Sequence, residues 1–255
     1  MKLWRRPAEA KFGELPAVGD VVRATAVAAD GKTAAIGDQA GVVRLYDLTT
    51  HKPLREIAAH QGSVNGVRFS IDGGTLFTAG EDRFIKAWKT TDGAETGKFE
   101  TPSPIRGLAL VAGGNQLVTG HDDKLLRVWS LPANPAPAEP PKPVFELKGH
   151  NDAITAVDGS PDSKYCVSAD KSAAVKVWSL ESKSQKAEYS QGGPVTGVAV
   201  SADGKRVASS GENGSVKVLV VAENKQLPEI RGDLADANRG RQGRADGRGG
   251  ESSDR

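Results

Sequence analysis

A short segment that ends in a large apolar side chain recurs along this chain at a nearly constant spacing. Its six copies are Lys2-Leu3-Trp4, Arg44-Leu45-Tyr46, Lys86-Ala87-Trp88, Arg127-Val128-Trp129, Lys176-Val177-Trp178 and Lys217-Val218-Leu219. The steps between the aromatic residues are 42, 42, 41 and 49 residues, and 41 more reach Leu219. A period in the low forties indicates one small structural unit copied in series, which constrains the fold more than any other feature.

Each copy has the pattern of four short strands separated by turns. In the copy that begins at Val64, an apolar strand leads to the turn Asp72-Gly73, and further strands are expected over 75–79, over 84–88 and from Gly97. Short alternating strands joined by turn residues indicate an antiparallel meander. The first strands of the other copies are expected to begin at Val22, Ile105, Ile154 and Val195.

One four-stranded sheet cannot bury both of its faces alone, whereas copies packed face to face around an axis can, and that arrangement is a β-propeller. The alternative, a β-sandwich, has no reason to repeat at this period. The sequence predicts an all-β propeller domain over 1–231, with five full four-stranded antiparallel blades plus one half blade in an open or incomplete ring. The half blade covers 1–15, and the full blades cover about 21–60, 61–104, 105–150, 151–194 and 195–231.

Two further motifs make the chain resemble the WD-repeat propeller family over residues 1 to about 231. A Gly-His-like pair precedes the first strand at Ala59-His60 and Gly149-His150, and the third strand has the order apolar, basic, apolar, Trp. The Trp-Asp pair of the family survives only as Tyr46-Asp47. The resemblance implies a propeller fold and a non-catalytic role in binding other proteins.

The resemblance also implies a buried hydrogen-bonded chain of His, Ser or Thr, Asp and Trp within each blade. Such a chain is chemically sound, because an indole N–H only donates, a hydroxyl relays the bond and a carboxylate holds the imidazole. One copy has all four members in His60, Thr78, Asp82 and Trp88. Two copies are incomplete: Thr119, Asp123 and Trp129 occur with Thr101 in the His position, and His150, Ser168 and Trp178 occur with Ser172 in the Asp position. The last copy keeps only Ser209, with Asn213 for Asp and Leu219 for Trp, and the first full copy keeps none, because Ile36 and Ala40 occupy the polar positions. We therefore expect blades of unequal stability. A catalytic triad of His60, Asp82 and Thr78 is the alternative, but Thr is a rare nucleophile.

The segments outside the repeats have biased composition. Residues 232–255 carry five Arg, four Asp and one Glu with almost no large apolar side chain, so we expect a disordered, neutral tail, although its Arg-Gly steps leave RNA binding as an alternative. The Pro-rich run 132–143 is expected to be an exposed loop insertion, with a ligand for a Pro-binding domain as the alternative.

The ring itself allows two interpretations. Either the chain is a fragment of a longer protein, or it is complete and a partner closes its open ring.

Composition and motifs exclude several classes of function. The net charge of +2 mixes both signs, so nucleic acid is not expected as a partner, and no apolar run reaches membrane-spanning length. Without a signal peptide the expected compartment is the cytoplasm. The single cysteine, Cys166, is expected to be buried, and His121 is expected on a solvated turn, with metal binding as the alternative. We expect no catalytic residues, no cofactor and no metal, because no phosphate loop, zinc motif or nucleophile motif occurs.

These observations predict a protein-interaction scaffold that binds a protein or peptide through one rim of the propeller. The candidate rim residues lie just inside the first strands or next to the Asp position: Arg23, Asn65, Arg106, Thr155, Thr196, Glu81, Asp122, Lys171 and Glu212. The alternative for each is an ordinary solvated side chain. Open propeller edges are expected to permit self-association. The rival hypotheses are a regulatory or substrate-presenting propeller of a larger enzyme, such as a bacterial kinase, peptidase or cytochrome, and an enzymatic propeller.

Overall fold

The structure is a computed structural model that describes residues 15, 16, 18–131 and 142–231. The predicted half blade lies outside these residues except for Leu15. The predicted tail lies wholly outside them, as does most of the predicted Pro-rich insertion. Statements about the fold below refer to the described residues.

Five antiparallel sheets make up the described chain, one for each predicted full blade. Blade 1 contains β1 (Val22–Val27), β2 (Thr33–Asp38), β3 (Val42–Asp47) and β4 (Lys52–Ala58). Blade 2 contains β5 (Val64–Phe69), β6 (Thr75–Gly80), β7 (Phe84–Lys89) and β8 (Glu95–Glu100), and blade 3 contains β9 (Ile105–Val111), β10 (Gln116–His121), β11 (Leu126–Ser130) and β12 (Phe145–Leu147). Blade 4 contains β13 (Ile154–Gly159), β14 (Tyr165–Asp170), β15 (Ala174–Ser179) and β16 (Ser184–Ser190). Blade 5 contains β17 (Val195–Val200), β18 (Arg206–Gly211), β19 (Ser215–Val220), β20 (Lys225–Gln226) and β21 (Ile230–Arg231).

The turn between the first and second strands shows why the pattern folds as it does. In blade 2 the Ser70 hydroxyl donates to Asp72 Oδ1 (2.5 Å), and the same oxygen accepts from the Gly74 amide (3.0 Å). Gly73 between them has a φ of +70°, which a residue with a side chain rarely adopts. Side chains therefore hold this turn closed, and the second strand returns antiparallel to the first.

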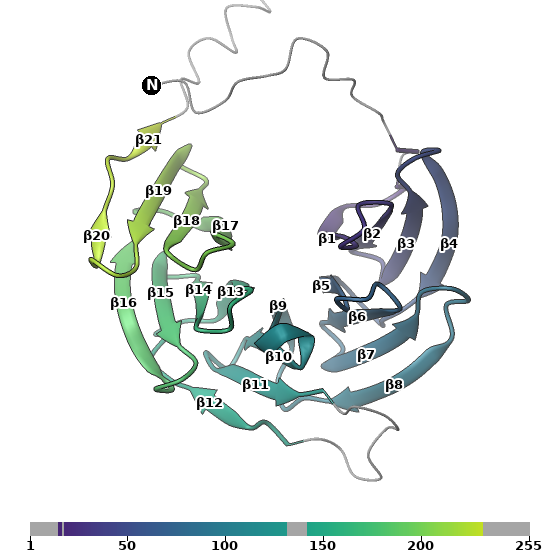
Figure 1. The fold of residues 1–255 in the computed structure, drawn as a ribbon, viewed down its shortest axis with the longest axis horizontal. Helices are drawn as coiled ribbons and strands as arrows, with labels where there is room; N and C mark the ends of the chain where they lie inside the picture. Colours follow the sequence, from purple (N-terminus) through teal and green to yellow (C-terminus); the bar gives the residue numbers. More distant parts are fainter. Residues whose placement is uncertain (1–14, 17, 132–141, 232–255) are drawn as a thin grey trace, which may run out of the picture.

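The five sheets stand around a central opening (Figure 1). Their first strands β1, β5, β9, β13 and β17 line the opening, and each of the first four contacts the first strand of the next blade. The fourth strands lie on the outside. Blade 1 and blade 5 face one another across a gap that no other described blade fills, so the described residues form the open ring of an all-β propeller (Figure 1).

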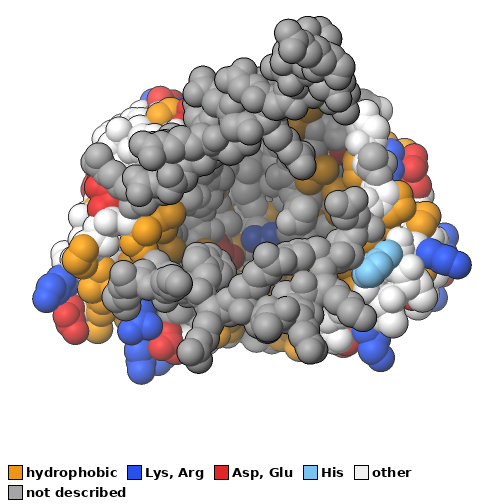
Figure 2. Space-filling model, turned by 90° about the horizontal axis from the view of Figure 1, so that it is seen from above, with side chains coloured by type: hydrophobic (Ala, Val, Ile, Leu, Met, Phe, Trp, Pro, Cys, Tyr) orange, Lys and Arg blue, Asp and Glu red, His pale blue; other side chains and the backbone are white. Residues whose placement is uncertain are grey.

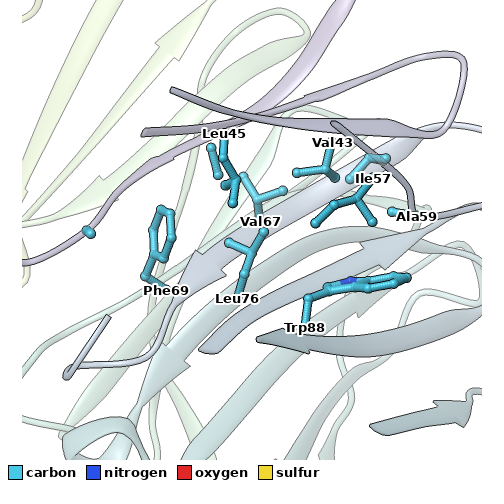
Figure 3. Packing of buried hydrophobic residues seen from close by; sticks show 11 residues of the cluster. Val43, Leu45, Ile57, Ala59, Val67, Phe69, Leu76 and Trp88 are labelled. Carbon is cyan, nitrogen blue, oxygen red and sulfur yellow. The ribbon is translucent and has the colours of Figure 1, made fainter. Parts of the chain in front are cut away.

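The hydrophobic core lies between neighbouring blades rather than inside one. Figure 3 shows Val43 and Leu45 of blade 1 packed against Val67, Phe69 and Trp88 of blade 2. Burying a side chain of this size contributes about 1.5–3 kcal/mol relative to leaving it exposed. The apolar third strand that repeats through the sequence therefore holds the blades together.

The basic residue of the third strand pairs across the blade with a glutamate of the fourth strand. Arg44 Nε lies 3.0 Å from Glu56, Arg127 Nε lies 3.0 Å from Glu146, and Lys176 Nζ lies 2.6 Å from Glu188. Each of these pairs is also directly opposed in the strand register. The recurring basic residue thus links the third and fourth strands in blades 1, 3 and 4.

Blade 5 departs from the others in its outer strand. Two short pieces, β20 and β21, pair with β19 in place of one continuous strand. Pro228 lies between them and has no amide hydrogen to donate to a strand partner, while the neighbouring Leu227 amide donates to Val218 O (2.8 Å). The outer strand of blade 5 is consequently interrupted between β20 and β21.

Candidate functional site

The best-matched blade, blade 2, contains a continuous hydrogen-bonded chain. Trp88 Nε1 donates to Thr78 Oγ1 (2.9 Å), which lies 2.8 Å from His60 Nε2, and His60 Nδ1 lies 2.8 Å from Asp82 Oδ1. Because the indole can only donate, the Thr78 hydroxyl donates onward to Nε2, and the ring proton at Nδ1 goes to Asp82. The four residues proposed from the family resemblance therefore lie together, and the chain ties the loop before β5 to β6 and β7.

Blade 4 has the same chain, and a carboxylate takes the place where the sequence suggested a serine. Trp178 Nε1 donates to Ser168 Oγ (2.8 Å), which lies 2.6 Å from His150 Nε2. His150 Nδ1 lies 2.7 Å from Asp170 Oδ2, and Asp170 is fully buried. The assignment of Ser172 to this position was wrong. Ser172 is exposed, and its hydroxyl donates to Asp170.

Blade 3 supplies its histidine from the end of β10. Trp129 Nε1 donates to Thr119 Oγ1 (2.7 Å), which lies 2.7 Å from His121 Nε2, and His121 Nδ1 donates to Ser103 O (3.0 Å). His121 is fully buried, so its placement on a solvated turn was wrong. Its two ring nitrogens are both occupied by protein groups, which leaves neither free to bind a metal.

Two residues expected in the blade 3 chain have other partners. Asp123 accepts two hydrogen bonds from Arg127 (3.1 and 2.7 Å) and does not reach His121 in the described structure. The Thr101 hydroxyl lies 2.9 Å from the carbonyl oxygens of both Arg83 and Ser103, which share its one hydrogen, and it does not fill the histidine position. Both assignments were wrong because His121, at the end of β10, places its imidazole beside Thr119, where the loop histidine lies in blades 2 and 4.

The first and last blades replace the chain with other groups. In blade 5, Ser209 Oγ accepts from Tyr189 Oη of the neighbouring strand β16 (3.0 Å) and donates to Gln191 Oε1, and Gln191 Nε2 donates to Ser215 Oγ (2.9 Å). In blade 1, the buried Asp38 accepts from Arg44 Nη1 (2.5 Å) and from the Val42 amide. Amide or ionic bonds thus replace the histidine chain in the end blades.

Burial sets the charge of the three chain histidines. Burial lowers the pKa of His60 and of His150, and the neighbouring Asp82 and Asp170 oppose it only in part. Burial lowers the pKa of His121 to about 4, because this histidine has a carbonyl and no carboxylate beside Nδ1. All three are therefore neutral near pH 7 and act as fixed structural donors and acceptors.

The rim is built by one backbone hydrogen bond that recurs in every blade. The residue that follows the second strand donates its amide to the carbonyl in the loop before the first strand. The pairs are Gln39 to Val21 (2.9 Å), Glu81 to Ser63 (3.0 Å), Asp122 to Pro104 (3.1 Å), Lys171 to Ala153 (3.0 Å) and Glu212 to Pro194 (3.0 Å). The backbone is the same at each position and the side chain differs, so the rim presents a varied set of groups on a constant frame.

Several candidate rim residues bond to one another or to the blade. Arg106 donates to both oxygens of Asp122 (2.8 Å each) and also pairs with Glu81 of the preceding blade. The Arg106 guanidinium holds the pKa of Asp122 below its usual value. The other bonds are Asn65 to Ile105 O (2.9 Å), Arg23 to Gln39 (2.7 Å), Thr155 to Ala169 O (3.3 Å) and Thr196 with Ser210 (2.8 Å).

Lys171 and Glu212 are the candidate rim residues whose side chains make no hydrogen bond or ion pair with the described residues. Both are exposed. They lie on neighbouring blades and carry opposite charges. The rim therefore offers a fixed ionic bridge between blades 2 and 3 and unpaired charges on blades 4 and 5.

The described residues contain no group of three or more His, Cys, Asp or Glu side chains arranged to hold a metal ion. In the same part of the chain, no helix has the length and apolar character needed to cross a membrane. Cys166 is fully buried, and burial raises the pKa of its thiol.

Comparison with known proteins identifies the family. The model of the WD domain, G-beta repeat, matches residues 51–89, 93–130, 141–179 and 183–218, which together make up more than half of the chain. The chain belongs to the WD40 repeat family, with five blades in its described residues.

Curated relatives match parts of larger proteins. Autophagy-related protein 16 of Arabidopsis thaliana is 26% identical over 178 residues, which cover 69% of this chain and 34% of that protein. Target of rapamycin complex subunit wat1 of Schizosaccharomyces pombe is 26% identical over 165 residues, 64% of this chain and 52% of that protein. Serine-threonine kinase receptor-associated protein of Dictyostelium discoideum is 26% identical over 49% of this chain and 41% of that protein. The chain thus spans between a third and about half of the length of these relatives.

Proposed function

We propose that this chain is a non-catalytic scaffold that binds a protein or peptide through the rim formed by the loops before the first strands and after the second strands. The observation that carries the proposal is the repeated backbone bond of the rim, which holds Gln39, Glu81, Asp122, Lys171 and Glu212 in equivalent places with different side chains. A constant frame with varied side chains is suited to recognition of an extended, chemically mixed surface.

Two further observations support a binding role over a catalytic one. The histidines His60, His121 and His150 are held in structural hydrogen bonds and are neutral, so they are not poised as exposed general bases. One of the relatives is a subunit of the target of rapamycin complex, and another is described as receptor-associated. These names describe proteins that associate with other proteins.

The test is a partner capture followed by charge reversal at the unpaired rim residues. Partners captured from the source organism with the full chain are measured against Lys171→Glu and Glu212→Lys. Each reversal is expected to weaken binding by about 1 kcal/mol or more where the contact is central. Arg106 is unsuited to this test, because its reversal also breaks the internal bridge to Glu81 and Asp122.

Lys52→Glu and Glu181→Lys serve as matched controls. Both residues are exposed, and they lie at the start of β4 and in the turn between β15 and β16, which places them at the opposite rim. Loss of binding in these controls together with full binding by the Lys171 and Glu212 variants would assign the partner to the opposite rim and refute the proposal.

A further inference from the structure

Blade 2 breaks the ionic pattern that links the third and fourth strands of blades 1, 3 and 4. In blades 1, 3 and 4 the basic residue of the third strand is opposed in register by a glutamate, namely Glu56, Glu146 or Glu188. In blade 2 the same position is held by Lys86, and its register partner is Lys98. Like charges directly opposite one another on adjacent strands are destabilising. A carboxylate that three blades contain is therefore replaced here by a second ammonium group.

The two lysines line an open depression on the surface. Its walls also include Gln61, Arg83 and Phe84, with Asp82 at one side, and the space open to solvent within it is about 500 Å³. The Phe84 side chain is partly buried and supplies an apolar wall. The depression is thus large enough for a side chain from a partner and carries three basic residues around it.

The acidic groups nearby leave the two ammonium groups incompletely paired. Asp82 already accepts from His60, from the Gln61 amide and from the Phe84 amide. Lys98 lies 3.9 Å from Glu95, well beyond the 2.6–3.0 Å of the glutamate pairs in the other blades. Glu100 pairs with Arg83 at 2.6 Å.

Lys86 is held in position with donors to spare. Its ammonium donates to Ala59 O and lies 5.9 Å from the Phe84 ring centre and 5.7 Å from the Trp88 ring centre. An ammonium group has three N–H donors, and only one of them is used by a described hydrogen bond. In blade 4 the equivalent Lys176 uses its ammonium on Glu188 (2.6 Å) and Gln185 (3.1 Å).

We propose that the depression lined by Lys86 and Lys98 binds a glutamate-type carboxylate from an acidic segment of a protein partner, in the place that Glu56, Glu146 and Glu188 hold in the other blades. The geometry of those three internal pairs shows which group fits against the third-strand cation. The depression adjoins the rim, because Asp82 directly follows the rim residue Glu81. The inference rests on the proposed scaffold function and specifies the charge of the segment that is bound.

The decisive variant is Lys98→Glu in the full chain, because it restores the pattern of the other blades and fills the depression from within. A fluorescently labelled oligoglutamate peptide is the probe, and binding is followed by anisotropy at fixed ionic strength. Lys98→Glu is expected to weaken binding by about tenfold. Lys186→Glu, an equal charge change on the outer strand of blade 4, is the matched control and is expected to leave binding unchanged.

Folding is monitored in the same samples. Lys98→Glu replaces a repulsive pair with an attractive one, so its thermal midpoint is expected to equal or exceed that of the unmodified chain. Loss of binding in a variant that is at least as stable cannot arise from unfolding. If the midpoint falls, Lys98→Gln replaces it and is expected to weaken binding in the same direction.

Three results would overturn the proposal: equal binding of oligoglutamate and oligoglutamine, equal losses in the Lys98 and Lys186 variants, or displacement of the probe by inorganic phosphate at lower concentration than by free glutamate. The last would identify a phosphoryl group as the ligand. The rim test at Lys171 and Glu212 is independent, so failure here leaves the scaffold proposal standing.

Discussion

At the scale of single residues, three blades reach the same hydrogen-bonded chain with different side chains. The hydroxyl always comes from the middle of the second strand, and the indole comes from the third strand. The imidazole comes from the loop before the first strand in blades 2 and 4, but from His121 at the end of β10 in blade 3. The hydrogen-bonded chain requires an imidazole beside the hydroxyl of the second strand, and more than one backbone position can place it there.

The buried neutral state of His121 predicts a pH-dependent stability. Its pKa is about 4 in the folded chain and about 6.5 in an unfolded chain, so the unfolded state takes up the proton first as the pH falls. The free energy of unfolding is therefore constant above about pH 6.5 and decreases between about pH 6.5 and 4, by at most about 3 kcal/mol from this residue. His60 and His150 shift in the same direction.

The measurement is the urea midpoint at about pH 7 and about pH 5 for the full chain and for His121→Gln. An amide already serves in the equivalent chain of blade 5, where Gln191 contacts Ser209. The variant is expected to lose less stability between the two pH values than the unmodified chain. An identical loss in both proteins would mean that His121 does not titrate on unfolding.

At the scale of strands and blades, the sequence predicted the elements more completely than their contacts. The first strands begin at Val22, Val64, Ile105, Ile154 and Val195, as the period indicated. Asp170 was missed because the acid was expected four residues after the hydroxyl, as Asp82 follows Thr78 in blade 2. In blade 4 the acid lies only two residues after Ser168. The opposition of Lys86 and Lys98 depends on a β-bulge between Ala87 and Trp88, and counting along a sequence does not reveal such a bulge.

Close approach between blades predicts a sharp difference between two strand glycines. A Cβ on Gly66 of β5 would lie 2.4 Å from the Leu108 Cβ of the next blade, which is attached to the backbone and cannot rotate away. Gly66→Ala is therefore expected to destabilise the protein by about 1–3 kcal/mol through overpacking. A Cβ on Gly97 of β8 would meet no atom within 4 Å.

Gly97→Ala is the matched control and is expected to be neutral or slightly stabilising, because alanine restricts the unfolded chain. Urea unfolding of both variants checks the contrast. Equal destabilisation by the two substitutions would argue against the tight packing of β5 on β9.

At the scale of the whole molecule, the open ring of the described residues leaves one face of blade 5 without a neighbouring blade among them. In blades 1, 3 and 4 the two apolar third-strand residues are buried to 1% exposure or less: Val43 and Leu45, Leu126 and Val128, Val175 and Val177. The equivalent Val216 and Val218 of β19 are only partly buried, and Ile230, opposite Val216, is 38% exposed. On the other side of the gap, Val27 of β1 is 58% exposed, whereas Phe69 at the same place in blade 2 is buried.

Seen from the open side, hydrophobic side chains lie on both flanks of the molecule (Figure 2). Exposed apolar sheet faces of this kind favour association, because each apolar group that leaves water stabilises the contact. The purified chain is therefore expected to form oligomers whose proportion rises with concentration, as measured by light scattering across a dilution series.

Val218→Asp places a charge on the open face of blade 5 and is expected to reduce the average mass toward that of a single chain. Leu54→Asp makes the same kind of change at an exposed site on β4, where Leu54 is 53% exposed, and serves as the control. Circular dichroism of both variants establishes that the sheets persist. Two results would show that these faces do not drive association: a chain that stays monomeric at every concentration, or equal effects of the two substitutions. The valines of β19 would then be tolerated in water because they are few and flanked by polar residues.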